Sequence, residues 1–158
     1  MLFVMMPLKK KVDFTLREIE ELDLQNGFFQ TLLNLTQVGE IETDYKKAKK
    51  ILKEIKSWPF YRIFVAVNDD GEILGSTTLL IERKFVHNGG KVGHIEDVAT
   101  KKEYEGMGVG SALVNRAVEF ARANKCYKVI LDCSEKNTQF YEKLGFKKHE
   151  VSMRYDIQ

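Results

Sequence analysis

Three glycines alternate with other residues in the segment Gly106-Met107-Gly108-Val109-Gly110, directly before a stretch with helical periodicity. Glycine has no Cβ, so a backbone built from it can approach a ligand closely and can adopt left-handed conformations. The first N–H groups of a helix lack intrahelical partners, and the helix dipole favours negative charge beside them. The segment therefore predicts a site for phosphate or diphosphate.

Two other motifs and one structural alternative compete for this glycine segment. A P-loop needs a Lys-Ser or Lys-Thr pair at the start of the helix, and Ser111-Ala112 stands there instead. A dinucleotide-binding fingerprint needs a third glycine where Ser111 stands, although Asp132 does follow at roughly the 20-residue distance that this fingerprint asks. The order of elements is also wrong for that fingerprint, because a predicted antiparallel hairpin precedes the segment. A tight strand–helix turn that binds nothing is the remaining alternative.

Three carboxylates lie at positions suited to general acid–base work. Glu96 and Asp97 are adjacent within a predicted strand, and Asp132 directly follows a run of apolar and β-branched residues. Neighbouring strand residues point to opposite faces, so only one of Glu96 and Asp97 can face a given ligand unless a β-bulge redirects the chain. By the same alternation Glu96 shares a face with His94. An ordinary strand-end acid is the alternative for each of the three.

These groups need a scaffold, and the periodicity of apolar residues predicts one in which strands and helices are mixed. Alternation and β-branched runs predict strands at residues 12–16, 60–67, 73–82, 91–100, 127–131 and 146–157. Helical spacing predicts helices at residues 18–35, 43–57 and 136–144, and one from the glycine segment to about 124. The expected fold class is α/β or α+β, with helices around one central sheet.

Local signals refine several of these elements. Gly27 is expected to weaken or divide the first helix, and Thr43 to cap the second. Trp58-Pro59 ends the second helix, and Asn68–Gly71 has hairpin chemistry. The run 127–131 is expected to be a buried strand. The inner face of the second helix comprises Tyr45, Ala48, Ile51 or Leu52, and Ile55, and its outer face carries Lys46, Lys47, Lys49, Lys50, Lys53 and Lys56.

Composition excludes several classes of protein. The 158 residues are 44% hydrophobic and 30% charged, with a net charge of +2, which fits one globular domain over 1–158 and gives no bulk-charge signal for nucleic acid. We interpret the lysine face as solvated surface, because no aromatic residues interleave with it. Apolar runs are too short for a membrane span. Met1–Met6 has its lysines after it, unlike a secretory signal, so we expect a cytoplasmic protein. Cys126 and Cys133 have no metal-ligand spacing, and we expect no metal.

Two regions together carry a resemblance to a known family. Asn137–Phe146 combines a helix, an inward tyrosine and a Gly-Phe exit to a strand, and with the glycine segment it resembles the GCN5-related N-acetyltransferase (GNAT) superfamily. That family carries a Gln/Arg-x-x-Gly-x-Gly/Ala loop around the diphosphate of acetyl-CoA, and Glu105 stands here at its first position.

Further blocks are similar to the eukaryotic members of that superfamily that acetylate glucosamine 6-phosphate. The similarity is dense from about residue 80 to 146 and poor after Met153. The blocks are Leu35–Gly39, Ile81–Lys84, Gly93–Ala99, Cys126–Cys133 and Glu135–Asn137.

The resemblance implies a single N-acetyltransferase domain of GNAT fold, with a mixed, mostly antiparallel sheet. It implies acetyl transfer from acetyl-CoA to D-glucosamine 6-phosphate in a ternary complex, on the way to UDP-N-acetylglucosamine, and a homodimer. Residues implied to bind the cofactor are Val98, Ala99, Thr100, Glu105, Gly106, Met107, Gly108, Val109, Gly110, Ser111, Asn137, Tyr141, Glu142 and Lys143. Those implied to bind the sugar phosphate are Thr36, Lys84, His87, Glu96, Asp97, Tyr127, Lys128, Asp132 and Arg154.

The resemblance also assigns chemical roles. The backbone N–H near Val98 would stabilise the tetrahedral intermediate, Tyr141 would protonate the leaving thiolate, and Glu96 or Asp132 would help to remove the amine proton. Two other functions stay open: a GNAT enzyme that acts on another small-molecule or protein amine, and an acyl-CoA-binding module without activity.

Overall fold

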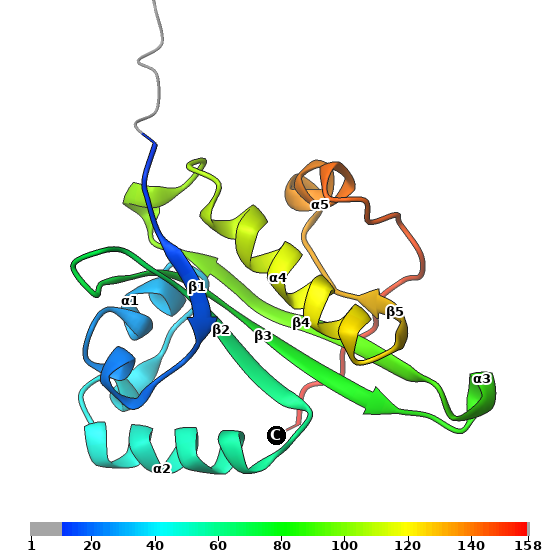
Figure 1. Ribbon diagram of the computed structural model, residues 1–158, viewed down its shortest axis with the longest axis horizontal. Coiled ribbons are helices and arrows are strands. Elements are labelled where there is room, and N and C mark those ends of the chain that lie inside the picture. Colours follow the sequence, from blue (N-terminus) through cyan, green and yellow to red (C-terminus); the bar gives the residue numbers. More distant parts are fainter. Residues whose placement is uncertain (1–10, 158) are drawn as a thin grey trace, which may run out of the picture.

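A five-stranded mixed sheet runs through the computed structural model, which describes residues 11–157 (Figure 1). Strands β1 to β4 pair antiparallel in chain order, and β5 joins β4 in parallel. The predicted mixed, mostly antiparallel sheet is therefore confirmed. The segment Met1–Met6 lies outside the described residues. The strands are β1 Thr15–Glu18, β2 Tyr61–Val67, β3 Ile73–Arg83, β4 Lys91–Thr100 and β5 Cys126–Ile130.

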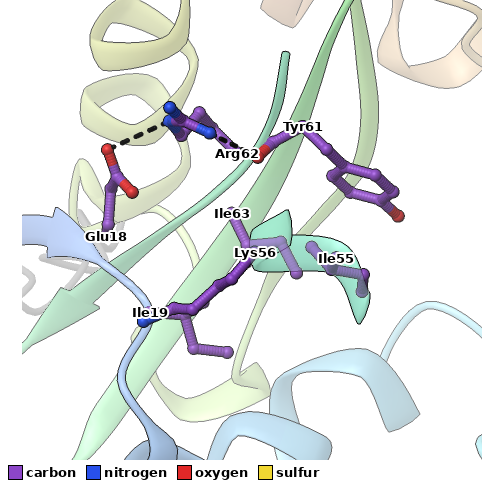
Figure 2. Close-up of a pocket in the computed structure, with 7 residues that line it drawn as sticks. All are labelled: Glu18, Ile19, Ile55, Lys56, Tyr61, Arg62 and Ile63. Carbon is purple, nitrogen blue, oxygen red and sulfur yellow. Dashed lines mark hydrogen bonds and ion pairs between the residues drawn. The ribbon is translucent and has the colours of Figure 1, made fainter. Parts of the chain in front are cut away.

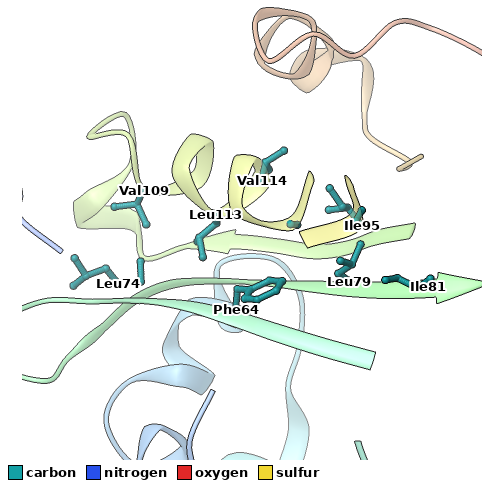
Figure 3. Packing of buried hydrophobic residues seen from close by; sticks show 11 residues of the cluster. Phe64, Leu74, Leu79, Ile81, Ile95, Val109, Leu113 and Val114 are labelled. Carbon is teal, nitrogen blue, oxygen red and sulfur yellow. The ribbon is translucent and has the colours of Figure 1, made fainter. Parts of the chain in front are cut away.

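Helices cover both faces of the sheet and form two apolar cores. The helix α4, Val109–Ala123, packs on one face, where Leu113 and Val114 meet Phe64, Leu79 and other strand residues (Figure 3). The helices α1, Phe28–Leu33, and α2, Tyr45–Ser57, cover part of the other face. Remaining short elements are η1 Glu21–Leu24, η2 Gly39–Glu42, α3 Val86–Gly89, η3 Lys102–Tyr104, η4 Glu135–Asn137 and α5 Thr138–Lys143.

Gly27 divides the first predicted helix, as expected. It separates η1 from α1 with a φ of +105°, a conformation that strains any residue with a Cβ. A Cβ there would also lie 2.8 Å from Lys101 Nζ. The helix predicted over residues 18–35 is therefore two short helices, and the chain between them approaches Lys101.

The second helix agrees with its prediction except at its cap. Asp44, and not Thr43, caps α2, because the Asp44 carboxylate accepts the backbone N–H of Lys47 while the Thr43 hydroxyl donates to the Glu40 carbonyl. Of the two alternatives for the inner face, Leu52 is buried and Ile51 is 40% exposed. The six lysines of the outer face are all exposed.

Two predictions at the edges of the sheet are wrong. The first strand is shifted to Thr15–Glu18, the residues that pair with β2. The strand predicted to be buried, β5, is only partly covered, and its Tyr127 and Lys128 are exposed. Within the described chain β5 has β4 as its sole partner, so it forms the edge of the sheet.

The predicted last strand is also absent. Residues 146–157 form no strand or helix, although their apolar residues alternate as a strand requires. Val151, Met153, Tyr155 and Ile157 are each 86–89% exposed. An alternating pattern specifies a strand only when the segment joins a neighbouring edge and an apolar face, and in the described chain this segment pairs with no strand and its apolar side chains stay exposed.

A polar network fixes the chain just before the glycine segment. Glu72, after the β2–β3 turn, accepts hydrogen bonds from Lys101 at 2.5 Å and from the Tyr104 hydroxyl at 3.1 Å. The Lys101 side chain is only 10% exposed. The hydrogen bond from Lys101 is the largest cause of a lowered pKa at Glu72.

No helix among residues 11–157 is long and apolar enough to cross a membrane.

We predict that Glu72→Gln lowers the free energy of unfolding by about 1–3 kcal/mol at neutral pH, because it leaves the Lys101 ammonium without its charged partner. The folded-state pKa of Glu72 is depressed, so this stabilisation is complete above the ordinary value of 4.5 and disappears as the pH falls through the folded-state value. Urea unfolding across the acidic range measures it. Glu103→Gln, an exposed acid on η3, is the matched control. A deficit that stays constant with pH would contradict the assignment to charge.

Candidate active site

A β-bulge in β4 lies at the paired acids. Thr78 pairs with Glu96 and Ser76 pairs with Ala99, so two β4 residues, Asp97 and Val98, stand opposite one β3 residue. Asp97 has a φ of +49°, which is uncommon outside glycine. The bulge supplies the redirection that the sequence left open, and Glu96 and Asp97 are both exposed residues. Regular alternation therefore does not separate the two acids here.

Beyond the first four residues of β4, the two parallel strands separate. The β4–β5 pairing runs from Lys91 to His94 only, and β5 ends at Ile130. Residues 95–100 of β4 therefore have no strand partner on the β5 side within the described chain. The predicted cofactor residues Val98, Ala99 and Thr100 all lie along this edge. Its backbone groups that point away from β3 are available to an extended ligand, apart from the Thr100 carbonyl, which accepts a hydrogen bond from Asn34.

The glycine segment follows this edge directly. Gly106 and Gly108 have φ values of +72° and +88°, so the turn needs residues without a Cβ. The backbone N–H groups of Gly108, Val109, Gly110 and Ser111 have no acceptor among residues 11–157, whereas Met107 donates to Tyr104. Four N–H groups at the head of a 15-residue helix suit an anion.

Gly110 connects the turn to the open edge and to the second motif. A Cβ at Gly110 would lie 3.4 Å from Thr100 Oγ1 and 3.5 Å from the Phe140 ring. The turn, the end of β4 and α5 therefore meet at one place.

Tyr141 on α5 presents a hydroxyl without a hydrogen-bond partner in the described chain. Its ring packs edge-on against Phe140 and Phe146, with centroids 4.9 and 5.9 Å away. Burial, followed by the nearby Cys133, raises the pKa of Tyr141 above its usual value of 10, which keeps the hydroxyl protonated at neutral pH. A protonated hydroxyl on a ring held by this packing is suited to donate a proton. Asn137, at the N-terminus of the same helix, and Glu142 and Lys143 are exposed.

Glu96 lies within electrostatic reach of the other two predicted acids. Burial raises the pKa of Glu96 first, and the negative charges of Asp97 and Asp132 raise it further, while His94 opposes them. A carboxylate with a raised pKa is a better proton acceptor than an ordinary one. Asp132 also accepts a hydrogen bond from Ser152 Oγ at 3.3 Å.

The predicted phosphate-binding cations are only partly assembled. Lys84 Nζ lies 2.8 Å from a Glu82 oxygen, and His87 stacks on Tyr127 with ring centroids 4.2 Å apart. Lys128 Nζ lies 6.0 Å from the Tyr127 ring centroid. Lys84, His87, Tyr127 and Lys128 thus gather around the β3–β4 connection and β5.

Two predicted residues stand apart from that group. Arg154 pairs with Asp156 in the exposed segment after α5, and its side chain is 85% exposed, so within one chain it does not join the other cations. Thr36 is exposed in the turn after α1.

Sequence reasoning missed two residues beside the acids and one beside the turn. Tyr61 is half-buried, and burial, then the charges of Asp97 and Glu96, raise its pKa. His94 Nε2 lies 2.9 Å from a Glu82 oxygen; strand alternation placed His94 on the face of Glu96, but the sequence assigned it no role. Asn34 contacts residues 66 and 71 positions later, a relation that no local pattern encodes.

A separate pocket lies between β1, β2 and the end of α2 (Figure 2). Isoleucines line one part of it, and Arg62 bridges the Glu18 carboxylate and the Tyr61 carbonyl in another. No residue predicted to act in catalysis or binding lines this pocket, and it has no positioned acid–base pair. Among residues 11–157 no group of three or more His, Cys, Asp or Glu side chains could hold a metal ion.

Comparison with known proteins gives one consistent result. The model of the acetyltransferase (GNAT) family matches residues 28–146. Glucosamine 6-phosphate N-acetyltransferase of Candida albicans is 39% identical over 89% of this chain and 93% of its own. The enzyme of the same name from Trypanosoma brucei brucei is 39% identical over 92% of this chain and 97% of its own.

Among solved structures, glucosamine-6-phosphate N-acetyltransferase from Arabidopsis thaliana superimposes with a TM-score of 0.88 at 33% identity, covering 92% of this chain and 99% of that one. The family match spans α1 to α5 and thus includes the bulge, the open edge, the glycine turn and Tyr141. This chain belongs to the GNAT family of acetyltransferases.

Proposed function

We propose that this protein transfers the acetyl group of acetyl-CoA to the amine of D-glucosamine 6-phosphate, giving N-acetyl-D-glucosamine 6-phosphate and CoA. The observation that carries the proposal is the open β4 edge that leads directly into a turn with four N–H groups that have no acceptor among residues 11–157. GNAT enzymes use acetyl-CoA, and such an edge and turn suit its extended arm and its diphosphate. The acceptor rests on the relatives named for glucosamine 6-phosphate, which match most of the chain.

The donor would lie along β4 and across the turn. Backbone groups of Val98, Ala99 and Thr100 would pair with its pantetheine arm, and the turn from Glu105 to Ser111 would hold its diphosphate. The α5 residues Asn137, Tyr141, Glu142 and Lys143 would contact the arm near the thioester. The long separation of β4 from β5 supports this placement, because unpaired backbone groups inside a fold need a partner.

The acceptor would lie against the acids of β4 and β5. Asp97 and Asp132 are suited to the sugar hydroxyls and amine, and the phosphate needs cations. Its proposed contacts are Thr36, Lys84, His87, Tyr127, Lys128 and Arg154, with Arg154 reaching the site only from a second copy of the chain.

The reaction would proceed by direct attack in a ternary complex. The neutral amine attacks the thioester carbon and a C–N bond forms, while the backbone N–H of Val98 stabilises the oxyanion. Glu96 accepts the amine proton, directly or through water, with Asp132 as the second candidate. The C–S bond then breaks, and Tyr141 donates its proton to the thiolate.

A homodimer is part of the proposal. The apolar residues of the last segment are almost fully exposed, and β5 is an open strand edge in the described chain. A second copy supplies the apolar face and the hydrogen bonds that this segment needs.

We place this single 1–158 domain in the cytoplasm, which is consistent with the two free thiols of Cys126 and Cys133. Its proposed product is used in the synthesis of UDP-N-acetylglucosamine.

The first prediction tests the function itself. Purified protein with acetyl-CoA should release free thiol on addition of glucosamine 6-phosphate, and much less with glucosamine, a peptide amine or a polyamine. A thiol-reactive dye measures the release. Thiol release with a peptide amine but none with glucosamine 6-phosphate would favour another GNAT acetyltransferase. Binding of CoA with no release from any amine would favour a module without activity.

Tyr141→Phe should lower kcat by about 100-fold or more, because it removes the proton donor and keeps the packing of the ring. The Kd for CoA should change little. The same assay and titration calorimetry measure the two quantities. Tyr45→Phe, on α2, is the matched control. An unchanged kcat would exclude Tyr141 as the donor.

The dimer is tested by Val151→Asp combined with Tyr155→Asp. Charges on the exposed apolar segment should convert the dimer to a monomer, because they would be buried without partners at the interface. Light scattering after size-exclusion chromatography measures the mass. Glu150→Gln, a polar change in the same segment, should leave the dimer intact. A wild-type protein that is monomeric would refute this part of the proposal.

A further inference from the structure

One side chain joins α1 to both ends of the segment that leads into the glycine turn. Asn34 Nδ2 donates to the Thr100 carbonyl at 2.8 Å and to Glu105 Oε1 at 2.7 Å. The amide nitrogen carries two hydrogens, so it can make both bonds at once. Thr100 is the last residue of β4, and Glu105 directly precedes the turn.

Asn34 is held in place by its own helix. It is the C-cap of α1, and the preceding turn of this helix is anchored in the core. Thr31 there is fully buried, and its hydroxyl lies 3.0 Å from Ser76 Oγ on β3. The Asn34 amide therefore projects from a fixed support and restrains whatever it binds.

The restrained group is an acid beside a proposed anion site. Glu105 is three residues from Gly108, where the run of unpaired N–H groups begins. A carboxylate free to turn towards these groups would repel a diphosphate and would compete for the same donors. Its bond to Asn34 instead holds one oxygen against the end of α1.

Glu72 binds Lys101 and Tyr104 of the same segment. The residues between β4 and the turn are thus fixed by contacts with two separate parts of the chain. The contact with Glu72 fixes the position of the segment, whereas the contact with Asn34 also fixes the charged carboxylate of Glu105.

We propose that Asn34 is a positioning residue that restrains the Glu105 carboxylate beside the glycine turn and thereby sets the affinity for the diphosphate of the acetyl donor. The inference rests on the proposed function, because it takes the turn as the diphosphate site. It assigns to Asn34 and Glu105 a role in donor affinity and none in the chemical step.

A double-mutant cycle tests this role. Asn34→Ala should raise the Kd for CoA and the KM for acetyl-CoA about three- to tenfold, because loss of the Asn34 contact lets the Glu105 carboxylate approach and repel the diphosphate more often. Glu105→Gln keeps an oxygen acceptor for Asn34 and removes the charge, so it should leave Kd unchanged or lower it. In the Glu105→Gln background, Asn34→Ala should change Kd less than about twofold.

Two controls separate positioning from a general loss of structure. S-acetylpantetheine lacks the diphosphate, so Asn34→Ala should lower its kcat/KM less than that of acetyl-CoA, because only the lost contact with Thr100 acts on both donors. The KM for glucosamine 6-phosphate should also stay constant. Gln30→Ala, an exposed change on the same helix, should leave the Kd for CoA unaltered.

Two results would overturn the inference. An equal rise in Kd on Asn34→Ala with Glu105 and with Gln at that position would show a structural tie without a charge effect. Wild-type protein that binds no CoA by calorimetry would refute the donor site and the proposed function with it. Wild-type binding with no effect of Asn34→Ala would refute the role of Asn34 alone.

Discussion

The separation of β4 from β5 is the constraint on which the candidate site depends. Two parallel strands that remained paired would satisfy their backbone groups mutually and would leave no edge inside the sheet. Here they pair over four β4 residues and then diverge, so the second half of β4 keeps polar groups without a strand partner in the described chain. A β-bulge lies at the start of that half, and the glycine turn lies at its end. A ligand that pairs with the edge is thereby led to the unpaired N–H groups of α4.

Side chains from distant parts of the chain fix this geometry. Glu72 holds Lys101 and Tyr104, Asn34 holds Thr100 and Glu105, and both contacts act on the short connection between β4 and α4. Gly27 must lack a Cβ because Lys101 lies against it. A flexible connection would lose part of its binding free energy in ordering the turn, and a connection fixed in advance avoids that loss.

Charge is divided between the acids and the cations of the site. Burial, and then the negative charges of Asp97 and Asp132, raise the pKa of Glu96, which suits the removal of a proton from an amine. The cations lie farther along β3, β4 and β5, where Lys84 already pairs with Glu82. A small acceptor with an amine at one end and a phosphate at the other would place its amine at the acids and its phosphate at the cations.

The sequence by itself determined the elements whose signals are local. Apolar alternation located β2, β3 and β4 within a residue, Trp58-Pro59 ended α2, and the alternating glycines indicated the turn before α4, because each depends on neighbouring residues only. The resemblance of residues 80–146 supplied the family and the site residues. Local signals failed where a cap had two adjacent candidates, as at Thr43 and Asp44.

Only the tertiary structure decided which polar groups meet and which strands find partners. The sequence could not reveal that Asn34 binds Glu105, that the β4 bulge exposes both Glu96 and Asp97, or that residues 146–157 form no strand. Each outcome depends on contacts between residues far apart in the chain, or on a partner edge that alternation cannot supply. Hydrogen-bond partners are set by which residues lie close together in the folded chain, whereas a sequence pattern shows only which donors, acceptors and apolar side chains are present.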